Sequence, residues 1–250
     1  MKDNFGVNVM NLSNIYLGVD TGYSGKDFSH RNLRRRNFNE QYLDSVIFTG
    51  ANLRYATFIY ATLNNVNFTG ADLRYAADLR YVNFLNATLN NVNFTGADLR
   101  YANFLNATLL NINNFSNADL RGVNLSNINL SNANLSDANL SNASLINVNF
   151  NGTDLRNTKL RGADLRDADL SNADLRGVNL SNINLSNVNF RGANLSNTNL
   201  DGADLRNANL TGANLRNANL RNTKLRDATF SNTICPDGHT TVLEFPRCNP

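Results

Sequence analysis

The residues that could carry acid–base or nucleophilic chemistry are few in this chain and far apart. The two histidines, His30 and His239, lie near opposite ends, and neither belongs to a motif with a serine or cysteine nucleophile. A catalytic triad needs a nucleophile, a histidine and a carboxylate in contact, so the sequence favours a protein that is not an enzyme. Aspartates are abundant, but they stand beside arginines, as Asp154 does beside Arg156, which is typical of solvated surface pairs.

The two cysteines offer a structural link. Cys235 and Cys248 could form a disulfide that fixes the C-terminal tail, and the alternative is a pair of reduced thiols in a cytosolic protein. The chain has no CxxC motif and no cluster of residues with metal-ligand spacing. The sequence therefore predicts no metal site and no cofactor.

Arginine and tyrosine recur together in a way that could bind a partner. Leu-Arg-Tyr units occur at 53–55, 73–75, 79–81 and 99–101. Columns of basic and aromatic side chains can bind nucleic acid, a glycan or a protein. The plainer alternative is a surface cation–π ladder copied by duplication. The candidate residues are Arg54, Tyr55, Arg74, Tyr75, Arg80, Tyr81, Arg100 and Tyr101.

A second basic group lies near the start of the chain. Arg34, Arg35 and Arg36 are consecutive, and they follow His30 and Arg31. This group could engage an acidic partner. The alternative is a solvated end cap that prevents stacking of one molecule on another.

These candidates must be positioned by an internal repeat with a period of five residues. A leucine or phenylalanine recurs every fifth residue from Phe28 to Phe230, giving forty-one centres and only two six-residue steps, to Leu79 and to Phe115. Alanine, valine, isoleucine or threonine usually stands two residues before each centre, with aspartate or asparagine between. A period of five fits neither an amphipathic helix nor one long strand, and tandem repeats at fixed period indicate a solenoid.

Alternation and longer repeats give the size of one coil. In extended backbone the centre and the residue two before it point the same way, so both are expected to face inward and the residue between them outward. The centres alternate Phe and Leu from Phe28 to Leu73, and the segment 83–89 recurs at 103–109. Both observations fit four repeats, or twenty residues, per coil. About ten coils at ~4.8 Å each predict an all-β rod on the order of 50 Å long.

The unit Ala-(Asp/Asn)-Leu-X-X, repeated over more than 200 residues, resembles the pentapeptide repeat family. The resemblance implies a right-handed quadrilateral β-helix with turns at its corners. The ending Thr233-Ile234-Cys235-Pro236-Asp237-Gly238 is similar to that of many cyanobacterial members, which suggests a cyanobacterial source. Identical segments at 61–76 and 87–102, and at 116–132 and 171–187, indicate growth by whole pentapeptides rather than whole coils. The Ala76-Ala77 step is expected to form a local bulge.

The chain divides into three parts. Residues 1–25 are an N-terminal lead-in with degenerate repeats, residues 26–235 form the repeat array, and residues 236–250 are a tail expected to cap the last coil. Many family members dimerise end to end, so a monomer or an end-to-end homodimer is expected. No apolar run is long enough to span a membrane and no signal-peptide core is visible, which predicts a cytoplasmic protein. The thylakoid lumen or periplasm would require a targeting segment outside the sequence.

Three functions remain open at this point. The first is a non-enzymatic scaffold whose partner is another protein. The second, implied by the resemblance, is a DNA mimic that binds or inhibits DNA gyrase, but a net charge of +3 and a pI of about 9.0 disfavour it. The third is a nucleic-acid or glycan binder that uses the arginine and tyrosine columns. The sequence favours the scaffold.

Overall fold

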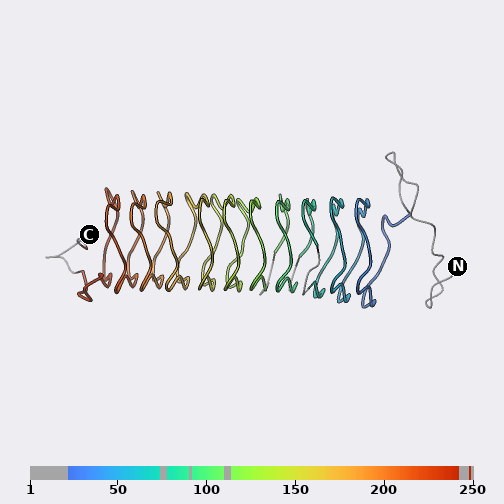
Figure 1. The fold of residues 1–250 in the computed structure, drawn as a ribbon, viewed down its shortest axis with the longest axis horizontal. Helices are drawn as coiled ribbons and strands as arrows, with labels where there is room; N and C mark the ends of the chain where they lie inside the picture. The colour runs from blue at the N-terminus through green and yellow to red at the C-terminus, as the bar shows by residue number, and fades with distance from the viewer. Residues whose placement is uncertain (1–21, 74–77, 90–91, 110–113, 242–247, 249–250) are drawn as a thin grey trace.

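The computed structural model describes residues 22–73, 78–89, 92–109, 114–241 and 248. These residues wind around one axis as a stack of coils and form a rod, with the early residues (blue) at one end and the late residues (red) at the other (Figure 1). The described residues contain no helix and no continuous strand. Their backbones pair instead through single parallel bridges, one in every pentapeptide.

The bridges confirm four pentapeptides per coil. Most of them join residues twenty apart, and the bridged residue is the one directly before each Leu or Phe centre. The bridges fall into four columns, which define four faces of the rod. Face 1 begins with Asp27↔Ile47, face 2 with Asn32↔Asn52, face 3 with Asn37↔Thr57 and face 4 with Tyr42↔Thr62.

The centres and the residues two before them fill the interior, as the alternation predicts. Almost all of them are buried, and large side chains such as Phe48, Phe68 and Leu180 are fully so. Because each coil lies directly over the last, like side chains stack: the Phe48 and Phe68 rings lie 5.0 Å apart and nearly parallel. The core is therefore a set of continuous columns, in which each side chain must fit the one above and the one below.

Each corner of the coil is a tight turn closed by its own backbone. At one corner Ala56 N–H donates to Leu53 C=O at 2.9 Å, and Tyr55 has a φ of +61°. A positive φ at the third residue is the mark of a type II turn, which favours Gly or Asn there. Asn or Gly occupies most of these positions. The bridged Asp or Asn adds a second constraint, because its Oδ1 accepts the N–H two residues on, as Asn52 does from Arg54 at 3.3 Å.

The two six-residue steps change the pairing over one coil and no further. Bridges from Thr57↔Asp78 to Asp72↔Asn93 join residues 21 apart, and the offset returns to twenty at Asp78↔Asp98. The same happens again at Asn93↔Asn114. The bulge expected at Ala76-Ala77 lies outside the described residues. Stacking resumes beyond each step, so the steps do not divide the rod.

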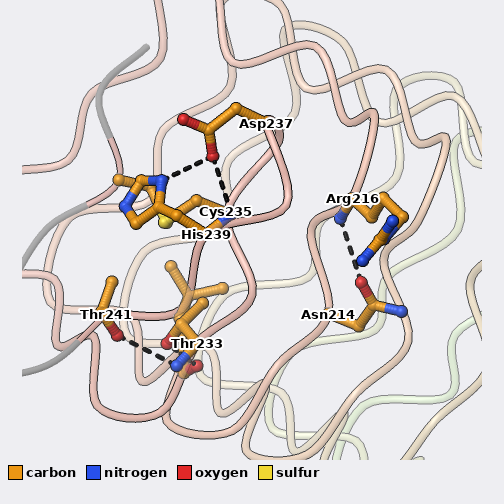
Figure 2. Close-up of a disulfide and its surroundings, with 9 residues drawn as sticks. Asn214, Arg216, Thr233, Cys235, Asp237, His239 and Thr241 are labelled. Atoms are coloured by element: carbon orange, nitrogen blue, oxygen red, sulfur yellow. Dashed lines mark hydrogen bonds and ion pairs between the residues drawn. A yellow bond between two sulfur atoms is a disulfide. The ribbon is translucent and has the colours of Figure 1, made fainter.

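Both ends carry additional packing. At the N-terminal end the Tyr23 ring contacts Phe28 and Phe38 at centroid distances of 6.0 and 6.2 Å. At the C-terminal end the chain turns back after Ile234 and forms an antiparallel bridge to Thr240. Figure 2 shows this reversal, with Thr233 N–H donating to Thr241 Oγ1 at 3.0 Å.

A disulfide joins Cys235 to Cys248 in the structure, and both residues are buried. Cys235 closes the last described coil, so the bond ties the end of the chain to the array (Figure 2). Residues 1–21 of the predicted lead-in, and residues 242–247 and 249–250 of the predicted tail, lie outside the described residues.

Replacing one inward leucine tests the register of the whole array. Leu180→Asp places a charge without a partner in a fully buried column, which costs more than the roughly 2–5 kcal/mol of a Leu→Ala cavity. We expect a large fall in the urea midpoint. The matched control is Asn179→Asp, because Asn179 is exposed on the adjacent outward position. Equal midpoints for the two variants would contradict the inward assignment.

Candidate interaction surface

The structure divides the predicted Leu-Arg-Tyr units between two faces. Arg54 lies on face 2, with Tyr55 at the corner that follows it, whereas Arg80 and Arg100 lie on face 3. Tyr81 and Tyr101 occupy the corner between faces 3 and 4. Arg74 and Tyr75 lie outside the described residues. The units at 79–81 and 99–101 therefore belong together, and the unit at 53–55 belongs to a different side of the rod.

Three tyrosines stack at the corner between faces 3 and 4. The ring centroids of Tyr60 and Tyr81 are 5.1 Å apart, and those of Tyr81 and Tyr101 are also 5.1 Å apart, with interplanar angles of 14° and 12°. Gly122 follows in the same column, and a Cβ there would lie 2.5 Å from Tyr101 Cε1, so the last ring lies over this glycine. Tyr60 was not predicted. Its 21-residue offset from Tyr81 is the signal that could have identified it.

These tyrosines hold a backbone conformation that suits other residues better. Their φ values are +57° for Tyr60 and +60° for both Tyr81 and Tyr101. The left-handed region costs roughly 1–2 kcal/mol for a residue with a Cβ, and Asn or Gly occupies the equivalent position in most coils. The array therefore gives up stability to place aromatic rings at this corner. Such strain is associated with functional positions.

Leucines on face 4 extend the apolar surface beside the tyrosines. Leu85 and Leu105 lie one coil apart at outward positions, and Leu105 is 50% exposed. Tyr60, Tyr81 and Tyr101 are 60%, 44% and 53% exposed. We call this set of five residues the tyrosine strip. Among the described residues, every large hydrophobic side chain that is exposed lies between Tyr42 and Leu105.

On face 3 the strip is bordered by a ladder of ion pairs. Arg100 Nε and Nη2 donate to Asp98 Oδ1 and Oδ2 at 2.9 and 2.7 Å, and Arg100 Nε lies 3.6 Å from Asp119 Oδ2 in the next coil. Arg80 makes the same contacts to Asp78 and Asp98, and Arg121 repeats the contact to Asp119 within its own coil. The full arginine ladder consists of Asp78, Arg80, Asp98, Arg100, Asp119 and Arg121.

Within the ladder, Asp98 and Arg100 stabilise each other's charged forms. Hydrogen bonds to Asp98 raise the pKa of Arg100. Partial burial raises the pKa of Asp98, but the hydrogen bonds and charge of Arg100 outweigh burial, so this pKa lies below its usual value. Three aspartates balance three arginines, so the border of the strip has no net charge although it is densely charged.

The arginine cluster near the start of the chain lies on the first coil. Arg34 and Arg35 stand over the Tyr55 ring, with Cζ atoms 5.0 and 5.8 Å from its centroid. Arg36 follows at an exposed position. These two cation–π contacts lie at a different corner from the tyrosine strip.

The described part of the chain contains no cluster of side chains with the spacing of a metal site. Within it, no three His, Cys, Asp or Glu side chains come close enough to hold a metal ion. His30 and His239 remain at opposite ends of the rod, and the His239 ring bonds to the Asp237 carboxylate (Figure 2). Nor do the described residues include a helix that could cross a bilayer.

A comparison with known families decides the classification. The model of the pentapeptide repeats matches eight copies, over residues 51–76, 77–111, 114–152, 133–172, 168–207 and 203–234. The chain belongs to the pentapeptide repeat family. Its fold is accordingly the right-handed quadrilateral β-helix, and members of this family are generally structural or interaction proteins rather than enzymes. No curated protein matches the sequence.

Solved structures of similar proteins come from several sources. HetL, a pentapeptide repeat protein involved in heterocyst differentiation regulation in the cyanobacterium Nostoc, is 34% identical over 86% of this chain and 93% of its own, with a TM-score of 0.43. A protein of the Arabidopsis thaliana thylakoid lumen is 30% identical over 42% of this chain and 66% of its own, with a TM-score of 0.26. QnrB1, a plasmid-mediated fluoroquinolone resistance protein, is 20% identical over 77% of this chain and 83% of its own, with a TM-score of 0.30.

Two glycine substitutions test the packing of the tyrosine column. Gly96 and Gly122 both have a φ of +66°, but nothing lies within 4 Å of a Cβ at Gly96. Gly96→Ala should cost about 1 kcal/mol, from backbone strain alone. Gly122→Ala should cost a further ~0.5–1.5 kcal/mol, because Tyr101 must leave its stack on Tyr81. Urea melts and the near-ultraviolet circular dichroism of tyrosine measure both effects, and equal losses would contradict the packing of Tyr101 on Gly122.

The Asp–Arg pairs outside the strip predict a dependence of stability on pH. Hydrogen bonds from the partner arginines lower the pKa values of three aspartates. Because the folded pKa lies below the unfolded value of about 3.9, each pair stabilises the fold above that value and ceases to do so as the pH falls through the folded pKa. The pairs are Asp154 with Arg156, Asp164 with Arg166 and Asp204 with Arg206.

Replacing all three aspartates with asparagine is the corresponding experiment. Asparagine occupies the same position in many repeats, so the variant should fold, with a lower urea midpoint than the wild type at pH 7. The difference between the two midpoints should narrow as the pH falls from about 5 to 2. A difference that stays constant over this range would contradict the lowered pKa values.

Proposed function

We propose that this protein is a non-enzymatic scaffold that binds another protein through the tyrosine strip. The observation that carries the proposal is the placement of three stacked, half-exposed tyrosines at left-handed corner positions. Tyrosine is enriched at protein interfaces, where its ring is buried and its hydroxyl keeps a hydrogen bond. Exposed apolar patches of this kind mark interaction sites.

The geometry supports a protein partner better than a nucleic acid. Bases stack on free aromatic faces, but both faces of Tyr81 are covered by the neighbouring rings. Binding of a nucleic-acid backbone requires a surface with net positive charge, whereas the border of the strip carries as many aspartates as arginines. A gyrase-binding DNA mimic needs a continuous negative surface, which this balanced ladder does not supply. The glycan-binding alternative has no further observation in its favour.

Three corner substitutions test the proposal. Tyr60→Asn, Tyr81→Asn and Tyr101→Asn together form the strip variant, which should keep or raise the thermal midpoint because asparagine tolerates a positive φ. Wild type and variant are used to capture proteins from lysate of the native organism. We expect the main captured partner to fall by at least about tenfold, since buried interface tyrosines contribute about 2 kcal/mol or more.

The matched control is Tyr55→Asn, which removes a left-handed tyrosine from a different corner. Capture by this control should equal that of the wild type. Capture of the same partners in the same amounts by all three proteins would contradict a role for the strip.

A further inference from the structure

The spacing of the tyrosine strip points to the shape of what binds there. We infer that its occupant is an amphipathic α-helix lying along the rod axis, with acidic residues on the flank that meets the arginine ladder. This inference rests on the proposed function and adds the class of partner. It follows from three features of the strip: its repeat distance, its area and the donors along its border.

The repeat distance matches a helix and not an extended chain. The tyrosine rings recur every 5.1 Å along the rod. One turn of an α-helix rises ~5.4 Å, so one apolar side chain per turn stays within about 0.6 Å of the tyrosine ring positions over two steps. Side chains on one face of a β-strand recur every ~6.8 Å and fall out of step by about 3.4 Å over the same distance. A polyproline helix rises ~9.3 Å per turn and would contact only every second ring.

The backbone of the rod also excludes a partner that would pair with it as an additional β-strand. Along faces 3 and 4 the N–H and C=O groups point along the axis and bond to neighbouring coils, as Tyr81 N–H does to Arg100 C=O at 3.0 Å. A partner strand could therefore not pair with this side of the rod, and its own backbone groups would lie unpaired on an apolar surface. A helix satisfies its backbone internally and brings only side chains to the contact.

The area fits one helix and is too small for a second copy of the rod. Aromatic side chains carry roughly 150–250 Å² each. The three tyrosines and Leu105 are 44–60% exposed, and Leu85 is partly buried. Five residues therefore offer on the order of 500 Å², whereas a standard interface buries about 800 Å² per partner. A single helix of three or four turns can cover the strip completely.

The border of the strip supplies the charge preference. Arg80, Arg100 and Arg121 bind their aspartates through Nε and Nη2. Within the described part of the chain no bond uses their Nη1 groups, each of which carries two N–H donors. The arginine side chains are 31–44% exposed and the aspartates 24–30%. An approaching helix meets the guanidinium groups first, so carboxylates one turn apart are the complementary groups.

A selection among peptide shapes tests the inference. Three display libraries of equal size are presented to the folded full-length protein: a stable helix with randomised positions i, i+3, i+4 and i+7 and their flanks, a β-hairpin, and a proline-rich segment. Binders are counter-selected against the strip variant, and affinities are measured by fluorescence anisotropy. We expect helical binders with apolar residues at one-turn intervals and Asp or Glu on one flank, and at least about tenfold loss of affinity for the strip variant.

The ladder is tested separately with a paired substitution. Asp98→Asn with Arg100→Gln removes one rung without a change of net charge, and the matched control is Asp154→Asn with Arg156→Gln on face 2. The first pair of substitutions should lower the affinity for the selected helices about threefold or more, and the control pair should leave this affinity unchanged. Selected helices without an acidic flank would overturn the charge preference.

The remaining outcomes separate this inference from the proposed function. Strip-dependent binders from the hairpin or proline-rich library would overturn the helix and leave a protein-binding strip in place. Tighter strip-dependent binding of a single-stranded oligonucleotide would overturn both in favour of nucleic acid. The absence of any strip-dependent peptide would overturn the helix, while the capture experiment with Tyr55→Asn still decides whether the strip binds a protein.

Discussion

Backbone pairing between coils of constant length is the constraint on which the rest of this structure depends. The N–H and C=O groups of one coil bond to the coils before and after it, so each residue lies over the residue about twenty positions away. Side chains of the same type therefore often lie directly over one another. Phenylalanines stack inside the rod, Asn207 Nδ2 donates to Asn187 Oδ1 at 3.0 Å at a corner, and the tyrosines stack at another corner. The stacking in the core, at the corners and along the tyrosine strip all follows from this one register of coil on coil.

The sequence was sufficient for the repeat, the inward positions and four pentapeptides per coil, because these follow from periods of five and twenty. It was not sufficient for the grouping of surface residues. Arg54 and Arg80 belong to the same Leu-Arg-Tyr motif, yet a six-residue step and a change of face separate them. Tyr60 joins Tyr81 only through a 21-residue offset. Counting residues does not reveal which coil absorbs an inserted residue, and that decides which side chains meet.

The role of the bridged Asp or Asn was also only partly visible in the sequence. Alternation placed it outward but gave no reason for its identity. The structure supplies the reason, since its Oδ1 accepts the N–H of the residue after the centre, and an arginine there can bind the same carboxylate. Many of the arginines that make the chain basic are thus already neutralised. A net charge of +3 describes the bulk protein and says little about any one face.

The four faces give the duplicated segments a further meaning. Asp72 lies on face 2, while Asp98, which occupies the same place in the second copy of the segment 61–76, lies on face 3. Asn124 lies on face 4, and its counterpart Asn179 lies on face 3. Each copied sequence has been turned by a quarter revolution about the rod. Because the offset between two copies is not a whole number of coils, duplication rotates a segment about the rod axis. The same residues then face a different direction without any substitution.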